Sequence, residues 1–455
     1  MAEREGFEPP IDLRLCLISS QVHSTGLCHL SAFFYFISVE RITAPLRLRI
    51  YPEVSRDIRF GFGVGILQTE HWTPELELWL RELTTASGFD NAGVAPVAAS
   101  NSEVGDDRVD AERFTSWVSS GRAGEMEYLK RRNEQGVLLR SEVQVAMPWA
   151  RSVIVCALNY NALGPLSIEN APTHTGWIAR YAWSGRAEGT DADELVPTDY
   201  HEELLARLRT VESKLRERFA CETRCYVDTG PLVERAAAAK AGIGWIGKNT
   251  CVIDQKLGSW LLLGVIVTSL PVVLDAKRYI AADRCGSCTR CIDACPTDAL
   301  VAPREMDASR CIAYLTIEKK GAIPEELREP MGRQVFGCDI CQDVCPWNRR
   351  APVASNEGML ARKQLINPTL EWLAGMDAVE FKRWFKGSPL ERTRRKRLHR
   401  NVAIAMGNSG EERFIDQLNQ WIEAEDPALA ESAGWALRRI QRFDGQSNAS
   451  EIDSE

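Results

Sequence analysis

The feature that most constrains this chain is a group of four cysteines, separated by two, two and three residues and followed by a proline. The segment CGSCTRCIDACP contains Cys285, Cys288, Cys291, Cys295 and Pro296. This spacing is typical of proteins that hold two 4Fe-4S clusters, in which three thiolates of the run bind one cluster and the fourth binds the other. The run therefore predicts a second set of cysteine ligands elsewhere in the chain.

A second set does follow, as Cys311 and then the segment CDICQDVCP. We predict that the first cluster takes Cys285, Cys288, Cys291 and Cys345, and that the second takes Cys295, Cys311, Cys338 and Cys341. The alternative is a pair of structural zinc sites, which use paired C-x2-C units. Zinc ribbons do not need a C-x3-C-P ending, and that ending occurs here twice, so the pattern favours two clusters.

The composition limits the remaining possibilities. The chain has 455 residues, of which 26% are charged, and its net charge is −8, so a contact with nucleic acid would need a local basic patch. No apolar run reaches the roughly 18 residues that span a bilayer, and we expect a cytoplasmic monomer without a membrane segment. Six cysteines lack partners at ligand spacing and are expected to be idle or buried thiols: Cys16, Cys28, Cys156, Cys221, Cys225 and Cys251.

The chain divides into regions of different character. Residues 1–70 show no helix or strand period, and we expect an N-terminal extension that is disordered or precedes the true start, with Val64 placed to serve as an alternative start. Residues 71–279 form the first predicted domain, 280–350 a ferredoxin-like domain with two clusters, and 351–443 a helical domain. Residues 444–455 are polar and acidic, which predicts a disordered tail.

Apolar periodicity predicts the elements of the first domain. A helix begins at Pro74, with Leu76, Trp79, Leu80 and Leu83 on one face. Strands are expected at 93–97, 152–158, 223–228 and 259–267, and further helices at 200–219 and 231–242. This alternation predicts an α/β or α+β domain around a central sheet, while NVAIAMGNSG and ALAESAGWALRRI predict a HEAT-type helix pair near the C-terminus.

The segment GIGWIGKNT (242–250) contains G-x-G-x-x-G but does not predict a nucleotide site. Nucleotide-binding loops of this kind follow a strand and open a helix, whereas here a predicted helix precedes the glycines and a strand follows. We expect instead a tight turn whose backbone passes close to a large flat group, with Lys248 and Asn249 offering polar contacts to it.

Several segments, in this order, resemble the epoxyqueuosine reductase family. They are GEMEYL, GWIARYA, DYH, VDTGPLVERAAAAKAGIGWIGKNT, GSWLLLG, the two cysteine segments and GSPLERTRRKRLHRNVAIAMGNSG. The resemblance covers roughly residues 75–440 and departs from the family in 1–70 and in an acidic insertion at 184–198. It implies a cobalamin-dependent enzyme that reduces epoxyqueuosine at the wobble position of tRNA to queuosine, with electrons supplied through two 4Fe-4S clusters by an unidentified donor.

The resemblance also implies roles for individual residues. Asp228 matches the family's proton donor, and strand alternation would place it on the same face as Tyr226. We expect burial beside a corrin ring to raise its pKa so that it is protonated near neutral pH; the alternative is a helix N-cap. The predicted cobalamin or substrate contacts are Arg180, Tyr181, Asp228, Lys248, Asn249 and Ser259.

A basic run in an otherwise acidic chain predicts the RNA surface. Residues 382–400 contain nine Lys or Arg and one acid, together with Trp384 and Phe385. Segments whose charges are nearly all positive often bind the phosphate backbone of nucleic acids. The alternative is that the charged side chains only face solvent. The predicted tRNA contacts are Arg392, Arg394, Arg395, Lys396, Arg397 and Arg400.

Two other functions fit part of the pattern. A reductive dehalogenase-like enzyme would also combine cobalamin with two ferredoxin clusters, but it would act on a small organohalide and would not need a basic helical domain. A pure electron carrier would need only the clusters, which would leave the α/β domain without a purpose. A bound corrinoid would distinguish the two enzymes from the carrier, and tRNA binding through the basic run would distinguish the two enzymes from each other.

Overall fold

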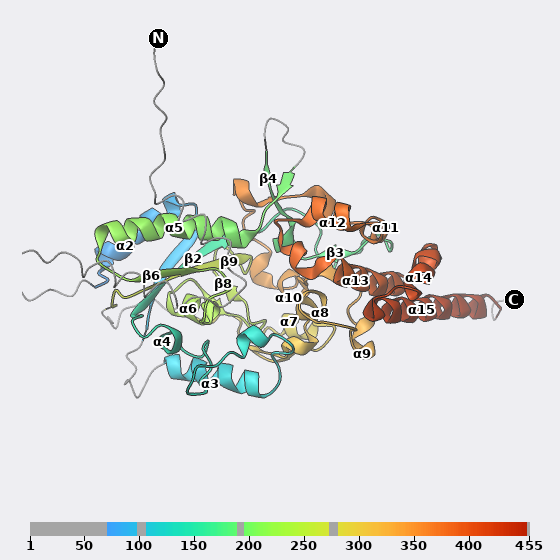
Figure 1. Cartoon of the computed structure of the whole chain (residues 1–455), viewed down its shortest axis with the longest axis horizontal. Helices are drawn as coiled ribbons and strands as arrows, with labels where there is room; N and C mark the ends of the chain where they lie inside the picture. Colours follow the sequence, from blue (N-terminus) through green and yellow to red (C-terminus); the bar gives the residue numbers. More distant parts are fainter. Residues whose placement is uncertain (1–70, 98–105, 189–194, 273–280, 453–455) are drawn as a thin grey trace, which may run out of the picture. The chain divides into compact units, whose positions relative to one another are not determined.

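A four-stranded sheet organises the N-terminal half of the computed structural model, which describes residues 71–97, 106–188, 195–272 and 281–452 (Figure 1). The strand order is β1-β2-β9-β6, with β1 at Asn91–Pro96, β2 at Ser152–Asn159, β9 at Leu261–Thr268 and β6 at Thr223–Tyr226. All three pairings are antiparallel, so this region is α+β rather than α/β. Local periodicity located the strands but could not reveal their relative directions, because direction depends on the connections.

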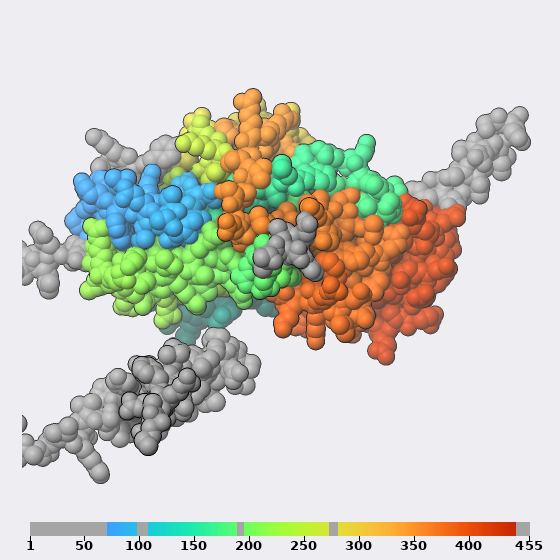
Figure 2. Space-filling view, turned by 90° about the horizontal axis from the view of Figure 1, so that it is seen from above, coloured from blue at the N-terminus to red at the C-terminus, as the bar shows by residue number. Residues whose placement is uncertain are grey.

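Helices cover both faces of this sheet. Helices α2 (Pro74–Ala86) and α5 (Tyr200–Arg218) lie side by side on one face, as Figures 1 and 2 show, and α6 (Glu234–Lys240) covers the other. Strand β2 is buried on both sides: Ile154 and Cys156 pack toward α2 and α5, whereas Val153 and Val155 pack toward α6. This two-sided burial explains why the strand reads as a continuous apolar run.

The helix ends follow from their local sequence, with one exception. The Thr73 side chain caps α2 and accepts a hydrogen bond from the Leu76 amide, and Pro74 occupies the first turn, as predicted. Helix α6 begins at Glu234 and not at the predicted Pro231, because residues 227–233 form an irregular turn after β6.

The cysteine-rich segment is built from short elements. Helices α7 (Arg290–Asp293) and α10 (Ile340–Asp343) follow the first cysteines of each run, and α8 (Ile312–Ile317) follows Cys311. Strand β12 (Gln334–Phe336) pairs in parallel with β3 (Trp177–Ile178), which ties this segment to the N-terminal half. The remaining short elements in this part of the chain are β10 (Leu300–Ala302), β11 (Glu305–Met306) and α9 (Glu325–Arg328).

The C-terminal region is helical, as expected. Helices α13 (Arg394–Ser409), α14 (Ile415–Ile422) and α15 (Pro427–Ile452) pack together, and a Cβ on Gly407 would lie only 2.7 Å from the Ala436 Cα, so glycine allows this close crossing. Leu315 and Phe336 of the cysteine segment share one core with Val402 and Ile440 of these helices. The predicted boundary at 350/351 therefore does not separate two hydrophobic cores.

Other elements and expectations are placed as follows. The predicted acidic insertion contributes β4 (Ser184–Ala187) and β5 (Leu195–Pro197), which pair with each other, and β4 also pairs with β13 (Leu360–Ala361). Helix α15 continues to Ile452, so the tail predicted to be disordered from 444 is helical there, because no proline interrupts the backbone bonding. The expectations for residues 1–70 lie outside the described residues.

No helix within the described ranges is long and apolar enough to cross a membrane. Further helices are α3 (Asp106–Ser119), α4 (Val143–Ala146), α11 (Leu370–Ala374) and α12 (Ala378–Phe385).

Candidate active site

Asp228 lies in the turn that follows β6, and not within the strand as predicted. Its φ is +62°, a left-handed conformation that is uncommon outside glycine and enriched in aspartate and asparagine. Strand alternation with Tyr226 therefore does not set the direction of its side chain. The carboxylate Oδ2 accepts a hydrogen bond from the Tyr200 hydroxyl at 3.1 Å and lies 3.5 Å from Nε2 of His201. The turn thus directs Asp228 toward the start of α5.

The first residues of α5 form the other side of this site. Asp199 is the N-cap: its Oδ1 accepts from the His201 amide at 2.9 Å and contacts His201 Nδ1 at 2.7 Å. The rings of Tyr200 and His201 stack with centroids 4.0 Å apart. His201 thus bridges Asp199 and Asp228. Sequence reasoning assigned no role to His201 or Tyr200, although the DYH segment before a helix was the available signal.

The protonation of this pair differs from the sequence-based expectation. The adjacent His201, with Tyr200 and Arg392, lowers the pKa of Asp228 to about 2, although burial alone would raise it. Burial would lower the pKa of His201, but the contacts with Asp199 and Asp228 outweigh that effect and raise it to about 9. At neutral pH the pair therefore holds its proton on His201. The sequence-based expectation is a raised pKa beside a bound corrin ring, and it stays a prediction; among the protein's own groups, the cationic His201 acts in the opposite direction.

The alternative role of Asp228 as a helix cap is wrong. The N-cap position of α6 is Val233, and no side chain caps that helix end. The Asp228 side chain is 54% exposed and contacts residues of α5 instead. The carboxylate is thus both accessible and coupled to a proton-bearing partner, which is the arrangement that a proton-transfer group requires.

Four further side chains lie near Asp228. Arg140 donates to the Asp228 backbone carbonyl at 3.1 Å, and the guanidinium groups of Arg140 and Arg392 lie 5.8 and 5.7 Å from the centre of the Tyr128 ring. On α6, Oε1 of Glu234 is buried without a hydrogen-bond partner in the described structure, and burial raises the pKa of this carboxyl to about 7. A buried acceptor of this kind suits a ligand that brings its own N–H groups.

The predicted contacts Arg180 and Tyr181 have different surroundings. Arg180 is 7% exposed; its Nη1 donates to Asn161 Oδ1 at 2.7 Å, and its guanidinium lies over Trp260 at 4.6 Å. Arg180 is therefore largely engaged within the protein, and its expected role as a pocket contact stays a prediction. Tyr181 packs against Tyr200 with ring centroids 5.8 Å apart, so it does border the Asp228 site.

Tyr181 also connects this site to the second cysteine run. Burial raises the pKa of Tyr181, and the nearby carboxylates of Asp339 and Asp228 raise it further. Asp339 follows Cys338 directly, and its Oδ2 accepts from the Arg180 amide at 2.6 Å. The segment Arg180–Tyr181 thus spans from the cysteine loop to Asp228.

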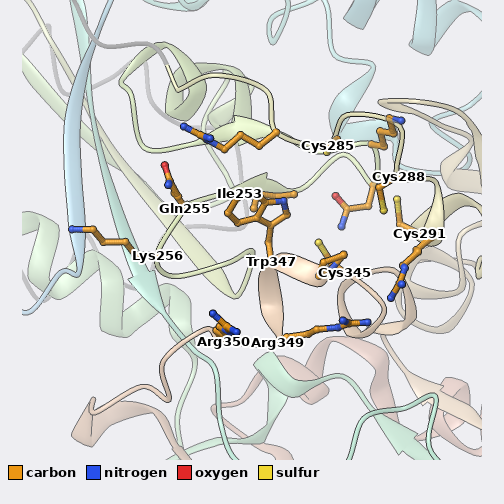
Figure 3. Close-up of a pocket in the computed structure, with 15 residues that line it drawn as sticks. Ile253, Gln255, Lys256, Cys285, Cys288, Cys291, Cys345, Trp347, Arg349 and Arg350 are labelled. Atoms are coloured by element: carbon orange, nitrogen blue, oxygen red, sulfur yellow. The ribbon is translucent and has the colours of Figure 1, made fainter.

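The cysteines of the first predicted cluster converge on one cavity. A cavity of about 650 Å³ is lined by all four of them, and Figure 3 shows the sulfur atoms of Cys288, Cys291 and Cys345 directed toward the same space. Burial and the neighbouring thiols of Cys285 and Cys291 raise the pKa of Cys345 to about 11. Bound iron would offset this by stabilising the thiolates. These four thiols come from two segments that are distant in the sequence. Each could bind one of the four irons of a 4Fe-4S cluster.

The second predicted group is assembled in the same way. Burial raises the pKa of Cys338, and the thiols of Cys311 and Cys295 act in the same direction; Cys341 neighbours both Cys338 and Cys311. In the part of the chain that the structure describes, no three His, Cys, Asp or Glu side chains could hold a single metal ion.

Cys251 departs from the expectation that it is idle, since its thiol shares a hydrogen bond with Cys341. Cys156 is buried, as expected for an inert thiol, and Cys221 and Cys225 are half-buried. Cys16 and Cys28 lie outside the described residues.

The other predicted cofactor contacts form hydrogen bonds to the cysteine loops, and their cofactor role stays a prediction. Asn249 is buried and donates to the Cys341 carbonyl at 3.3 Å, and Ser259 donates to Gln342 Oε1 at 2.8 Å. Lys248 Nζ donates to the Gly286 carbonyl at 2.7 Å, beside the first run. At Gly244 a Cβ would lie 2.2 Å from the Ile253 carbonyl, so this glycine allows the chain's own strands to approach each other closely. Strands β7 (Trp245–Ile246) and β8 (Val252–Ile253) form a hairpin here, and the approach of a large flat group stays a prediction.

The basic run divides into exposed and buried members. Arg392, Arg394 and Lys396 are exposed and Arg395 is half-exposed. Arg397 donates to the carbonyls of Thr393, Ile317 and Arg392. Arg400 is 1% exposed, and its Nη atoms donate to the carbonyls of Leu315, Lys319 and Gly321. The prediction that Arg400 contacts tRNA is wrong, and Arg397 is largely engaged, because a charge run gives no information about which members turn inward.

Cluster ligation gives a first prediction. Anaerobic reconstitution is expected to yield about eight irons per chain, and Cys295→Ser should remove the cluster held with Cys338 while the cluster held with Cys345 persists. The reason is that the Cys295 thiol lies near those of Cys311 and Cys338, which belong to the second predicted group. Iron analysis with electron paramagnetic resonance measures this. Cys156→Ser is the matched control, and stoichiometric zinc without iron would contradict the assignment.

Comparison with family models supports both halves of the site. Residues 284–348 match the 4Fe-4S double cluster binding domain, and residues 140–229 match the model described as Epoxyqueuosine reductase QueG, DUF1730. The second match ends just after Asp228, and the first contains all eight predicted ligands.

Individual proteins match over most of the chain. Epoxyqueuosine reductase of Xanthomonas campestris pv. campestris is 38% identical over 367 residues, covering 79% of this chain and 94% of that protein. The Escherichia coli K12 epoxyqueuosine reductase is 33% identical, covering 81% and 89%.

Solved structures give the same result. An epoxyqueuosine reductase in complex with an epoxyqueuosine-modified tRNA-Tyr stem loop matches with a TM-score of 0.68 at 28% identity, covering 80% of this chain and 90% of that chain. The Bacillus subtilis epoxyqueuosine reductase, captured with its catalytic aspartate loop swung out of the active site, matches with a TM-score of 0.67 at 27% identity, covering 80% and 90%. These matches confirm the resemblance seen in the sequence motifs. The chain therefore belongs to the epoxyqueuosine reductase family.

Proposed function

We propose that this chain reduces the epoxide of epoxyqueuosine at the wobble position of tRNA, giving queuosine. The observation that carries the proposal is the contact of Asp228 with a protonated His201 at a site that Tyr181 connects to the second cysteine group. Conversion of the epoxide to the alkene consumes two electrons and two protons and releases the oxygen as water. The site supplies a proton source and an electron source close to each other.

Cobalamin is the cofactor that we propose for this site. When bound, it supplies the cobalt centre through which electrons reach the epoxide. The described residues fit a corrin because its fringe of amide groups can donate to the orphaned Oε1 of Glu234, and because Tyr181 and Tyr200 offer an aromatic wall. The half-exposed carboxylate of Asp228 leaves the site open to a substrate.

The proton step follows from the Asp228–His201 pair. The epoxide oxygen becomes a poor leaving alkoxide unless it is protonated as its C–O bond breaks. Asp228 is the exposed member of the pair, so it relays to this oxygen the proton that His201 holds, which Asp228 receives across their 3.5 Å contact. Asp199 keeps the imidazole oriented through its contact with Nδ1. His201 is thus a positioning and proton-storing residue, and Asp228 is the catalytic residue.

Substrate RNA is proposed to reach Asp228 over the exposed part of the basic run. Arg392 joins the two, because it lies near Asp228 and belongs to this run. Tyr128 is 41% exposed beside Arg392 and offers a face on which a splayed-out base can stack. Single-stranded RNA loops allow a base to leave its stack in this way.

The two alternatives are less well supported. A dehalogenase-like enzyme would have no use for a basic run that leads through Arg392 to the catalytic carboxylate. A pure electron carrier would not need the proton pair at Asp228 and His201. Family membership favours the tRNA substrate over both.

The basic run gives the test of the RNA substrate. The triple variant Arg394→Glu, Arg395→Glu, Lys396→Glu should weaken binding of an epoxyqueuosine-containing tRNA stem loop and reduce the slope of log K against log salt by about 2–3. The reason is that each lost cation no longer releases counterions from a phosphate. Fluorescence anisotropy over a salt series measures this.

A matched control tests the specificity of that effect. The variant Arg209→Glu, Arg224→Glu, Arg442→Glu reverses three exposed arginines outside the basic run and should leave the slope nearly unchanged. Equal salt slopes for wild type and the Arg394, Arg395, Lys396 variant would show that the run is only a solvated face.

A further inference from the structure

The charged side chains that line the cavity beside the first cysteine group are all positive. Besides the four cysteines, its lining contains six cationic side chains and no carboxylate within the described residues. The cations are Lys248, Lys256, Arg284, Arg290, Arg349 and Arg350. Figure 3 shows Arg349 and Arg350 along one border of this space, with Cys345 and Trp347 above them. We call these six residues the cationic rim.

The cationic rim is available to a partner. Lys256, Arg284, Arg290, Arg349 and Arg350 are all exposed, and none of them takes part in an ion pair with another described residue. This is unusual for a chain whose net charge is −8. Carboxylates near the rim are used elsewhere, since Asp283 pairs with Arg304. The rim thus concentrates uncompensated positive charge at one place, where it attracts anionic surfaces.

The rim borders the first cysteine group, whose four thiols line the same cavity. Cys285, Cys288 and Cys291 are only half-buried, so a carrier at this surface comes close to the cluster they hold. The second group, through Asp339 and Tyr181, is the one that borders the Asp228 site. This arrangement suits electron entry at the first group, followed by transfer to the second group beside the Asp228 site.

We propose that the cationic rim is the docking surface for an acidic electron-carrier protein that delivers one electron per encounter. This inference rests on the proposed function, because a reductase needs an external reductant. Each encounter oxidises the carrier by one electron and reduces the cluster held by Cys285, Cys288, Cys291 and Cys345 by one. Two encounters supply the two electrons that one epoxide consumes, and the two protons come from the Asp228 site and solvent. Charge complementarity sets the partner, and the half-buried Trp347 supplies an apolar contact inside the charged border.

RNA is the competing partner for a cationic surface. The position of the rim favours a carrier, because the rim surrounds a cluster that can accept electrons, whereas the substrate base must reach Asp228. The basic run that includes Arg392 already leads to Asp228, so the RNA does not need the rim.

The test is a stopped-flow measurement on the reconstituted holoenzyme, without RNA. Photoreduced flavodoxin serves as the acidic one-electron donor, and the methyl viologen radical cation serves as a donor of opposite charge. The variant is Arg284→Glu, Arg349→Glu, Arg350→Glu, and the control is Arg209→Glu, Arg224→Glu, Arg442→Glu. Iron content and visible absorbance confirm that both variants hold both clusters.

The expected result is at least about a tenfold lower bimolecular rate of cluster reduction by flavodoxin in the rim variant, with a flattened salt dependence, because steering by charge is lost. The rate with methyl viologen should be unchanged or higher, and the control variant should match wild type with both donors. Because the readout is cluster reduction and not turnover, a chain that does not reduce epoxyqueuosine would still give this result.

Two outcomes would overturn the proposal. Equal flavodoxin rates in the rim variant and wild type would show that the carrier docks elsewhere. A rim variant that keeps the flavodoxin rate but binds the tRNA stem loop more weakly than the control variant would assign the rim to RNA.

Discussion

Asp228→Asn is expected to lower turnover by about 10²–10⁴-fold, the usual contribution of a positioned acid, while both clusters and cobalamin remain bound. The amide can neither receive the proton held by His201, 3.5 Å away, nor release one to the epoxide oxygen. Its shape preserves the contact with the Tyr200 hydroxyl. The measurement is single-turnover conversion of epoxyqueuosine tRNA by the reduced holoenzyme, with nucleosides analysed by mass spectrometry.

The backbone at this position calls for a specific control. Asp228 has a φ of +62°, and Asp298, which is also exposed, has a φ of +51°. Because asparagine tolerates left-handed backbone as well as aspartate does, Asp298→Asn should fold normally and turn over at the wild-type rate. A wild-type rate in Asp228→Asn would show that the proton transferred to the epoxide oxygen comes from another group.

Arg400→Met is expected to lower the free energy of unfolding by on the order of 3 kcal/mol or more. The side chain is 1% exposed and holds the carbonyls of Leu315, Lys319 and Gly321. Methionine preserves much of the volume but leaves the buried Leu315 carbonyl and the part-buried carbonyls of Lys319 and Gly321 without their donor, at a cost of about 1 kcal/mol each. The lost bonds join α13 to the segment after Cys311, so iron should also be released at a lower temperature. Anaerobic thermal unfolding of the holoenzyme, followed by circular dichroism and cluster absorbance, measures both effects.

The matched control for Arg400 lies on the same helix. Arg394 begins α13, is exposed, and forms no ion pair among the described residues. Arg394→Met should therefore keep the unfolding temperature of wild type and weaken only RNA binding. Equal unfolding temperatures for Arg400→Met and wild type would show that the buried carbonyls find other donors.

The cluster ligands were the most predictable part of this protein. The spacing of the cysteines carries the assignment, because a run that gives its fourth thiol to another cluster requires a second run. The neighbours of Cys295 and Cys345 in space agree with that crossing. The pattern of apolar residues also located α2, α5 and β2. This pattern is local, so it can be recognised within each segment of the sequence alone.

The protonation of the site was not predictable in the same way. The pKa of Asp228 depends on His201, which lies on another element and contacts Asp228 only because a left-handed turn directs the carboxylate toward α5. The inward turn of Arg400 likewise depends on the cysteine segment packing against α13. Neither long-range contact leaves a periodic signal in the sequence. The same is true of the orphaned Glu234, whose burial follows from the fold.

The most direct test of the central claim is the reaction itself. Holoenzyme reconstituted with iron, sulfide and cobalamin is incubated anaerobically with a strong one-electron reductant and epoxyqueuosine-containing tRNA, and the digested nucleosides are quantified by mass spectrometry. We expect queuosine to replace epoxyqueuosine, and the conversion to require cobalamin, the reductant and Asp228. Unchanged epoxyqueuosine from a protein that holds cobalamin and both clusters in reduced form would contradict the proposed function.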